Sequence, residues 1–115
     1  MDELTGAILE KIVYRADRII RYVTEHTQET FLADEMVQDA VCMNLLNIGE
    51  LVKQLPIDIR TQYPLVPWRK LAGLRDITAH RYDSLRMVDI WTAANKEVSA
   101  LKTQVEEILE QREMK

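Results

Sequence analysis

The last third of the chain carries the pattern that most constrains its fold. Between residues 87 and 108, apolar side chains recur at alternating steps of four and three residues. They are Met87, Trp91, Ala94, Val98, Leu101, Val105 and Ile108. This spacing is a heptad seam, which is typical of a helix that packs along another helix. We therefore expect a long helix from about Asp83 and Ser84, which are good N-cap types, to about Gln111. Its partner is another helix of a bundle or a second subunit.

The remainder of the chain also favours helices. Helical spacing of apolar residues predicts one helix over 2–27 and a second over 34–55, which Pro56 ends. Residues 26–30, HTQET, are predicted to form a loop, and residues 56–67 to hold one short helical turn. A third helix is predicted over 68–80. With three Gly and three Pro, the chain has few turn residues for a sheet protein, so the predicted fold class is all-α.

Length and composition narrow the class of protein. A chain of 115 residues is enough for one domain, predicted over 1–115. A single cysteine, Cys42, excludes an internal disulfide and a thiolate zinc cluster, and it lies in an apolar run typical of a core. The chain opens without a signal-peptide pattern and has no apolar run of about 18 residues. We expect a soluble cytoplasmic protein without a membrane segment.

The distribution of charge points to a confined anion site. The net charge is −4, yet residues 69–86 contain five basic side chains and two acidic ones. A basic island in an acidic chain favours a local anion site over a broad nucleic-acid surface, although simple charge clustering is the alternative. Lys11, Arg15 and Arg18 line one face of the first helix. We interpret them as a solvated face partly neutralised by neighbouring acids such as Glu10, Asp17 and Glu25, with a phosphate-tracking surface as the alternative.

Arg75 raises a specific question about its partner. On an ideal third helix it shares the apolar stripe of Trp68 and Leu71, so it is expected on or beside the buried face. A buried guanidinium requires an anion, either a protein carboxylate or a ligand phosphate. His80 follows five residues later, about 140° around an ideal helix. The two side chains converge only if the helix ends near His80 or if two subunits share a groove.

The residues around His80 have the chemistry of a metal-independent phosphodiester-cleaving site. Asp76 lies four residues before His80 and can hold its imidazolium, which would raise the pKa of His80. His80 would move a proton at an attacking or leaving oxygen, and Arg75 would hold the phosphate. RNA is the favoured substrate because its own 2′-hydroxyl serves as nucleophile. No His pair or carboxylate cluster has metal-ligand spacing, and a purely structural His–Arg pair is the alternative.

The second helix offers two further features. Asn44 and Asn47 lie along one ridge, either as a polar edge beside the core or as support reaching toward a site on a neighbouring helix. Gly49 lowers helix stability, which indicates a place where another helix approaches closely.

Arg75, four residues, His80, one residue and Tyr82 together resemble the Arg-x4-His-x-Tyr signature of HepT-like toxins in the HEPN superfamily. The segment AVCMNLLNIGELVKQLP at 40–56 resembles the second helix of that family, with its Ile-Gly-Glu element. YPLVPWRKLAGLRDITAHRYD at 63–83 resembles its Pro-x-x-Pro-Trp lead into the signature, and VDIW at 88–91 also fits. The resemblance covers nearly the whole chain, although Asp76 stands where many relatives have Asn.

This resemblance implies a four- to five-helix up-and-down bundle that forms a homodimer and acts as a metal-independent endoribonuclease without a cofactor. Arg75 and His80 would be catalytic at a cleft between subunits, with Asp76, Asn44 and Asn47 as candidate support. A nucleotidyltransferase antitoxin would neutralise the toxin by adding AMP to Tyr82, as in a type VII-like toxin–antitoxin pair. The alternatives are a non-catalytic, nucleotide-binding helical partner of a nucleotidyltransferase and a purely structural oligomerisation bundle.

Overall fold

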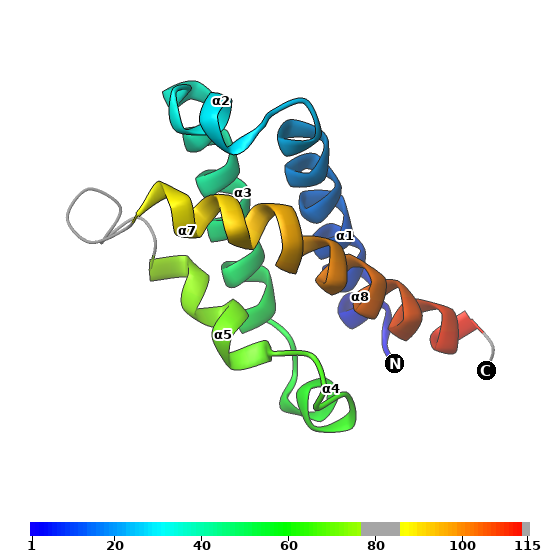
Figure 1. Cartoon of the computed structure of the whole chain (residues 1–115). Helices are drawn as coiled ribbons and strands as arrows, with labels where there is room; N and C mark the ends of the chain where they lie inside the picture. Colours follow the sequence, from blue (N-terminus) through cyan, green and yellow to red (C-terminus); the bar gives the residue numbers. More distant parts are fainter. Residues whose placement is uncertain (77–85, 114–115) are drawn as a thin grey trace.

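The computed structural model describes residues 1–76 and 86–113, and its regular elements are all helical (Figure 1). Three long helices carry the fold: α1 (Glu3–Thr24), α3 (Glu35–Lys53) and α8 (Val98–Glu113). Shorter elements join them: α2 (Gln28–Leu32), α4 (Ile57–Gln62), α5 (Trp68–Ala72), the 3₁₀ helix η1 (Gly73–Asp76), α7 (Met87–Thr92) and the π-helical turn η2 (Ala93–Glu97). The predicted all-α class is confirmed.

Two aspartates set the starts of the first long helices. The side chain of Asp2 accepts a hydrogen bond from the Thr5 amide at 2.6 Å, and Asp34 accepts one from the Val37 amide at 3.2 Å. Such N-caps satisfy amides that have no partner within the helix. The Thr5 amide also lowers the pKa of Asp2, so this cap is ionised at neutral pH. Both helices begin within a residue of the predicted position.

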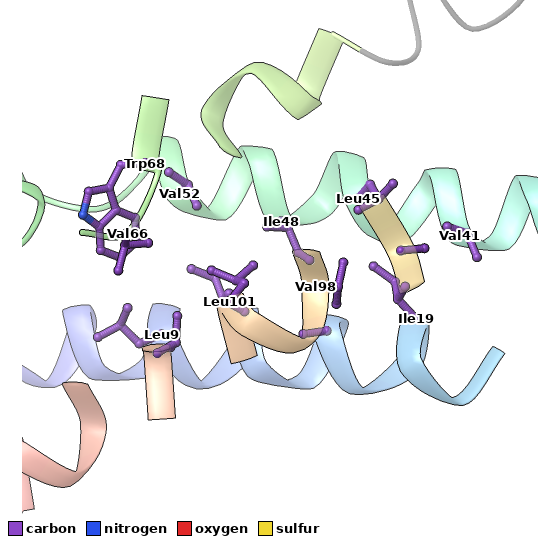
Figure 2. Close-up of a cluster of buried hydrophobic side chains, with 14 of the residues drawn as sticks. Leu9, Ile19, Val41, Leu45, Ile48, Val52, Val66, Trp68, Val98 and Leu101 are labelled. Atoms are coloured by element: carbon purple, nitrogen blue, oxygen red, sulfur yellow. The ribbon is translucent and has the colours of Figure 1, made fainter. Parts of the chain in front are cut away.

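The hydrophobic core lies where α1, α3 and α8 meet. Figure 2 shows side chains of all three helices in one cluster, among them Leu9, Ile19, Leu45, Ile48, Val98 and Leu101. Val66 and Trp68 extend the cluster toward α5, and Cys42 is buried in it as predicted. α3 packs against α1 and also against α5 and η1, so it is the scaffold on which the residues near Arg75 rest (Figure 1).

The predicted heptad seam is confirmed from Ala94 onward and shifted before it. Ala94, Val98, Leu101, Val105 and Ile108 are all buried. Earlier along the helix, Ile90 is the buried residue, while Met87 and Trp91 are only partly buried against the core. The cause is η2, because a π turn contains one residue more than an α-helical turn and so rotates the side chains of α7, which precedes it. The Trp91 ring then contacts Phe31 of α2, with centroids 5.3 Å apart.

The boundaries of two elements differ from the sequence prediction. The predicted loop HTQET is wrong in its second half, because Thr27 and Thr30 form a capping box that starts α2 at Gln28. α7 starts at Met87, after the extended residue Arg86, and Asp83 and Ser84 lie outside the described residues. The predicted helical turn within 56–67 is confirmed as α4.

The predicted third helix is only partly correct. It is α-helical from Trp68 to Ala72 and then narrows to the 3₁₀ helix η1, which ends the described segment at Asp76. Residues 77–80 of the prediction lie outside the described residues. In the part of the chain that the structure describes, no helix is long and apolar enough to cross a bilayer.

Candidate functional site

Arg75 is held in place by a close contact between two helices. A Cβ atom at Gly49 would lie 2.5 Å from the backbone nitrogen of Arg75 and 3.1 Å from the carbonyl oxygen of Leu71. Real Cβ atoms are essentially never found at 2.5 Å, so only glycine lets η1 rest this closely on α3. Leu71 and Leu74 pack against the core from the same segment. The predicted close approach at Gly49 is confirmed, and it fixes the backbone of Arg75.

The side chain of Arg75 is more exposed than the helical wheel predicts. A 3₁₀ helix turns by about 120° per residue and an α-helix by about 100°, so residues 73–75 add roughly 60° of rotation. This rotation moves Arg75 away from the buried stripe of Trp68 and Leu71, and its side chain is 44% exposed. Arg75 was expected on or beside the buried face, and the structure rules out the first of these positions. Its guanidinium is open to an external anion.

Asp76 is the ion-pair partner of Arg75 in this structure. The Arg75 Nε and the Asp76 Oδ1 are 3.6 Å apart, and the Asp76 side chain is 62% exposed. An exposed pair of this kind contributes at most about 1 kcal/mol. A phosphate that binds the guanidinium at two points competes well against such a weak partner. Asp76 is thus positioned to reduce, without abolishing, the anion affinity of Arg75.

Further positive charge lies along α5. An open depression of about 650 Å³ is lined by Arg60, Arg69 and Lys70 together with apolar side chains. Lys70 donates to Glu97 at 2.9 Å, and Arg60 donates to the Val52 carbonyl at 2.7 Å. Arg69 and Lys70 of the basic island predicted from the sequence therefore line one depression with Arg60 of α4.

The other members of the predicted site fall into two groups. His80 and Tyr82 lie outside the described residues, so their contacts with Arg75 and Asp76 stay predictions. Asn44 is buried, accepts from Arg15 of α1 at 3.2 Å and donates to the Ala40 carbonyl at 2.8 Å. Asn47 donates to the Met43 carbonyl at 2.9 Å. Both asparagines thus make these hydrogen bonds with α1 or within α3, and in the described residues neither is hydrogen-bonded to Arg75.

A second group of functional candidates, which the sequence reasoning captured only in part, lies on α1. The Arg18 guanidinium donates to the hydroxyls of Tyr14 at 2.9 Å and Tyr22 at 2.8 Å and lies within 6 Å of both ring centres. The hydrogen bond to Tyr14 raises the pKa of Arg18. We call Lys11, Tyr14, Arg15, Arg18 and Tyr22 the α1 strip. The sequence signal that could have identified the whole strip is the repeat of Tyr14, Arg18 and Tyr22 at steps of four residues.

The described residues offer no ready metal site. Within 1–76 and 86–113, no three His, Cys, Asp or Glu side chains lie close enough together to hold a metal ion.

Comparisons with known proteins agree with the sequence resemblance. The family model "Ribonuclease HepT-like" matches residues 12–108. A Methanocaldococcus jannaschii protein named "Putative RNase MJ0125" is 35% identical over 109 residues, which are 95% of this chain and 94% of that protein. "Putative RNase TTE0752" of Caldanaerobacter subterraneus subsp. tengcongensis is 36% identical over 102 residues, covering 89% and 91%.

A third relative carries the family name itself. "Probable ribonuclease HepT" of Thermococcus cleftensis is 32% identical over 100 residues, covering 87% of this chain and 91% of that protein. No solved structure gives a significant match.

Proposed function

The chain belongs to the HepT-like ribonuclease family, and on that premise we propose that it is an endoribonuclease toxin that cleaves RNA through Arg75 and His80 without a metal ion. One observation carries this proposal. Gly49 clamps the backbone of Arg75 against α3, while the Arg75 side chain stays 44% exposed beside a weak carboxylate partner. A fixed but accessible guanidinium is what binding of a phosphodiester requires.

The proposed reaction uses the nucleophile that RNA supplies. The 2′-hydroxyl loses its proton and its oxygen bonds to phosphorus, while the bond from phosphorus to the 5′ oxygen breaks and that oxygen gains a proton. His80 moves a proton at the attacking or the leaving oxygen. Arg75 donates hydrogen bonds to the phosphate oxygens as their charge develops. The products are a 2′,3′-cyclic phosphate and a 5′-hydroxyl end.

The first test is cleavage by the purified protein in excess EDTA. We expect single-stranded RNA to be cut, and mass spectrometry of the fragments to show 2′,3′-cyclic phosphate ends. Loss of activity in EDTA would contradict the metal-independent mechanism. A protein that is inert toward RNA yet binds tightly to an adenylyltransferase would support the alternative of a non-catalytic partner.

We further propose that Tyr82 is the site at which an antitoxin acts. Incubation with the partner nucleotidyltransferase and ATP is expected to add AMP to the wild-type chain and suppress its RNA cleavage, since a phosphodiester beside Arg75 would repel the RNA backbone. Tyr82→Phe keeps the ring and removes the acceptor hydroxyl, so it should remain unmodified and active. Tyr63→Phe is the matched control, and intact-mass spectrometry should show AMP addition to it as to wild type. AMP on Tyr82→Phe would place the modification elsewhere.

The active unit is proposed to be a homodimer in which two copies of residues 75–82 face a shared cleft. The exposed edge at η1 leaves Arg75 accessible to a second subunit. Light scattering at micromolar concentration should give twice the 13.4 kDa mass of one chain. A stable monomer that cleaves RNA at full rate would refute the shared cleft.

A further inference from the structure

The α1 strip is a basic surface that forms no ion pair with the acidic residues the structure describes. Among the described residues, no ion pair of the structure includes Lys11, Arg15 or Arg18. Two of the three neighbouring acids expected to neutralise the strip are engaged elsewhere. Glu10 pairs with Arg112 at 3.3 Å, and Asp17 pairs with Lys102 of α8 at 2.7 Å. The expectation of a partly neutralised face is therefore wrong for these two acids, and the strip keeps its positive charge.

The strip also has unused hydrogen-bond donors. Arg18 has five N–H groups, of which two bond to the tyrosine hydroxyls and a third, at Nε, is buried, so two remain for an external acceptor. Tyr14 and Tyr22 accept in these bonds, so the proton of each hydroxyl remains available to an acceptor. Arg15 is oriented by its bond to the buried Asn44. These donors are preorganised for an anion such as a phosphate, because the two tyrosines and Asn44 already hold the guanidinium groups in place.

Aromatic surface lies beside these donors. Tyr14 is 52% exposed, and its ring centroid lies within 5.6 Å of both the Arg15 and Arg18 guanidinium carbons. An exposed ring next to cations suits an unpaired base whose phosphate is held alongside it. From Lys11 to Tyr22 the strip extends about 16 Å along the helix, enough for a few nucleotides. A duplex would not offer its base faces to such a ring.

We propose that the α1 strip is a second contact surface for single-stranded RNA, which holds the strand by its phosphates and stacks a base on Tyr14. This inference rests on the proposed ribonuclease function and extends it. The strip and η1 flank α3 on different sides, because Asn44 faces α1 while Gly49, about 140° further around α3, faces Arg75. Two interhelical spacings, roughly 20 Å, separate them. Only an extended substrate reaches both.

The test measures RNA binding as a function of salt. The probe is a fluorescent single-stranded 24-mer of mixed sequence with 2′-O-methyl groups, which blocks cleavage. Each lost phosphate contact should reduce the slope of log Kd against log salt by about 0.7, so Arg15→Gln/Arg18→Gln should reduce it by about 1.4. Lys96→Gln removes an exposed charge from η2 and should leave the slope unchanged. Tyr14→Leu should weaken binding by about five-fold or more, and Tyr14→Phe, which keeps the ring but loses the hydroxyl bonded to Arg18, should weaken it less.

The outcomes separate this inference from the proposed function. Strip variants should cleave a dinucleotide at the wild-type rate and long RNA more slowly. If wild type cleaves RNA but its salt slope equals that of the double variant, the strip inference fails alone. If nothing is cleaved but the slopes differ as expected, the proposed function fails and the binding surface stands. A change of oligomeric state in Tyr14→Leu, whose half-exposed ring is outside the core, would make the strip a protein contact and overturn the inference.

Discussion

Replacing His80 by alanine is expected to lower the rate of RNA cleavage by about 10²–10⁴-fold, the usual contribution of a positioned general acid or base. Arg75→Ala should cost about 10²–10³-fold, because it removes the donors that stabilise charge on the phosphate. Arg75→Lys keeps the charge but loses the two-point geometry, and we expect an intermediate rate. The measurement is single-turnover cleavage of a labelled RNA in EDTA.

The chain contains a matched control for His80. His26 is the only other histidine, and its ring contacts Thr30 at 3.1 Å near the start of α2. His26→Ala should retain the wild-type cleavage rate, and both histidine variants should retain the helical circular dichroism spectrum. Wild-type activity in His80→Ala would eliminate the proposed proton transfer. A comparable loss in His26→Ala would show that the assay reports stability and not chemistry.

Gly49→Ala is expected to damage both stability and activity. The added Cβ would meet the backbone of Arg75 at 2.5 Å, and a backbone atom has no rotamer with which to avoid it. Over-packing of this kind typically lowers the free energy of unfolding by about 1–3 kcal/mol. Because η1 carries Arg75, relief of the clash also moves the guanidinium. A displacement of about 1 Å at a catalytic group can reduce the rate by about 10²-fold.

Gly73→Ala is the comparison that isolates this effect. Gly73 lies in the same segment with a helical φ of −66°, and a Cβ there would meet nothing within 4 Å. The substitution should raise the free energy of unfolding by about 0.4–1 kcal/mol, by restricting the unfolded chain, and leave cleavage unchanged. Thermal melts and single-turnover rates of the two variants together provide the test. If Gly49→Ala and Gly73→Ala had the same stability and the same cleavage rate, the argument that α3 positions Arg75 would fail.

Much of the fold was predictable because its signals are local. The apolar spacing of α1, α3 and α8 follows from burial of one helix face, and Asp34 marks a helix start through its own side chain. Where the helical-wheel prediction was wrong, the cause was a short departure from α-helical geometry. Neither the π turn at Ala93–Glu97 nor the 3₁₀ turn at Gly73–Asp76 changes which residues are apolar. Each one rotates its neighbours, so that Ile90 is buried and Arg75 is exposed.

The ion pairs of the acidic residues on α1 could not be predicted from that helix alone. The sequence places Glu10 and Asp17 beside the basic residues of α1, and a helical wheel offers them as partners. In the folded chain α8 lies alongside α1, and Arg112 and Lys102 take both carboxylates. The positive charge of the α1 strip therefore results from the packing of a helix that lies more than 70 residues later in the chain.

The sequence by itself determined the helical class, the family motif and the identity of the candidate catalytic pair, because residue types and their spacing are properties of a short stretch of chain. Only the tertiary structure decided which side of α3 each element occupies. Gly49 brings Arg75 to one side, and the Arg15–Asn44 bond holds the α1 strip on another. The physical reason is that backbone approach and charge pairing between helices depend on distances across the fold, which no local pattern records.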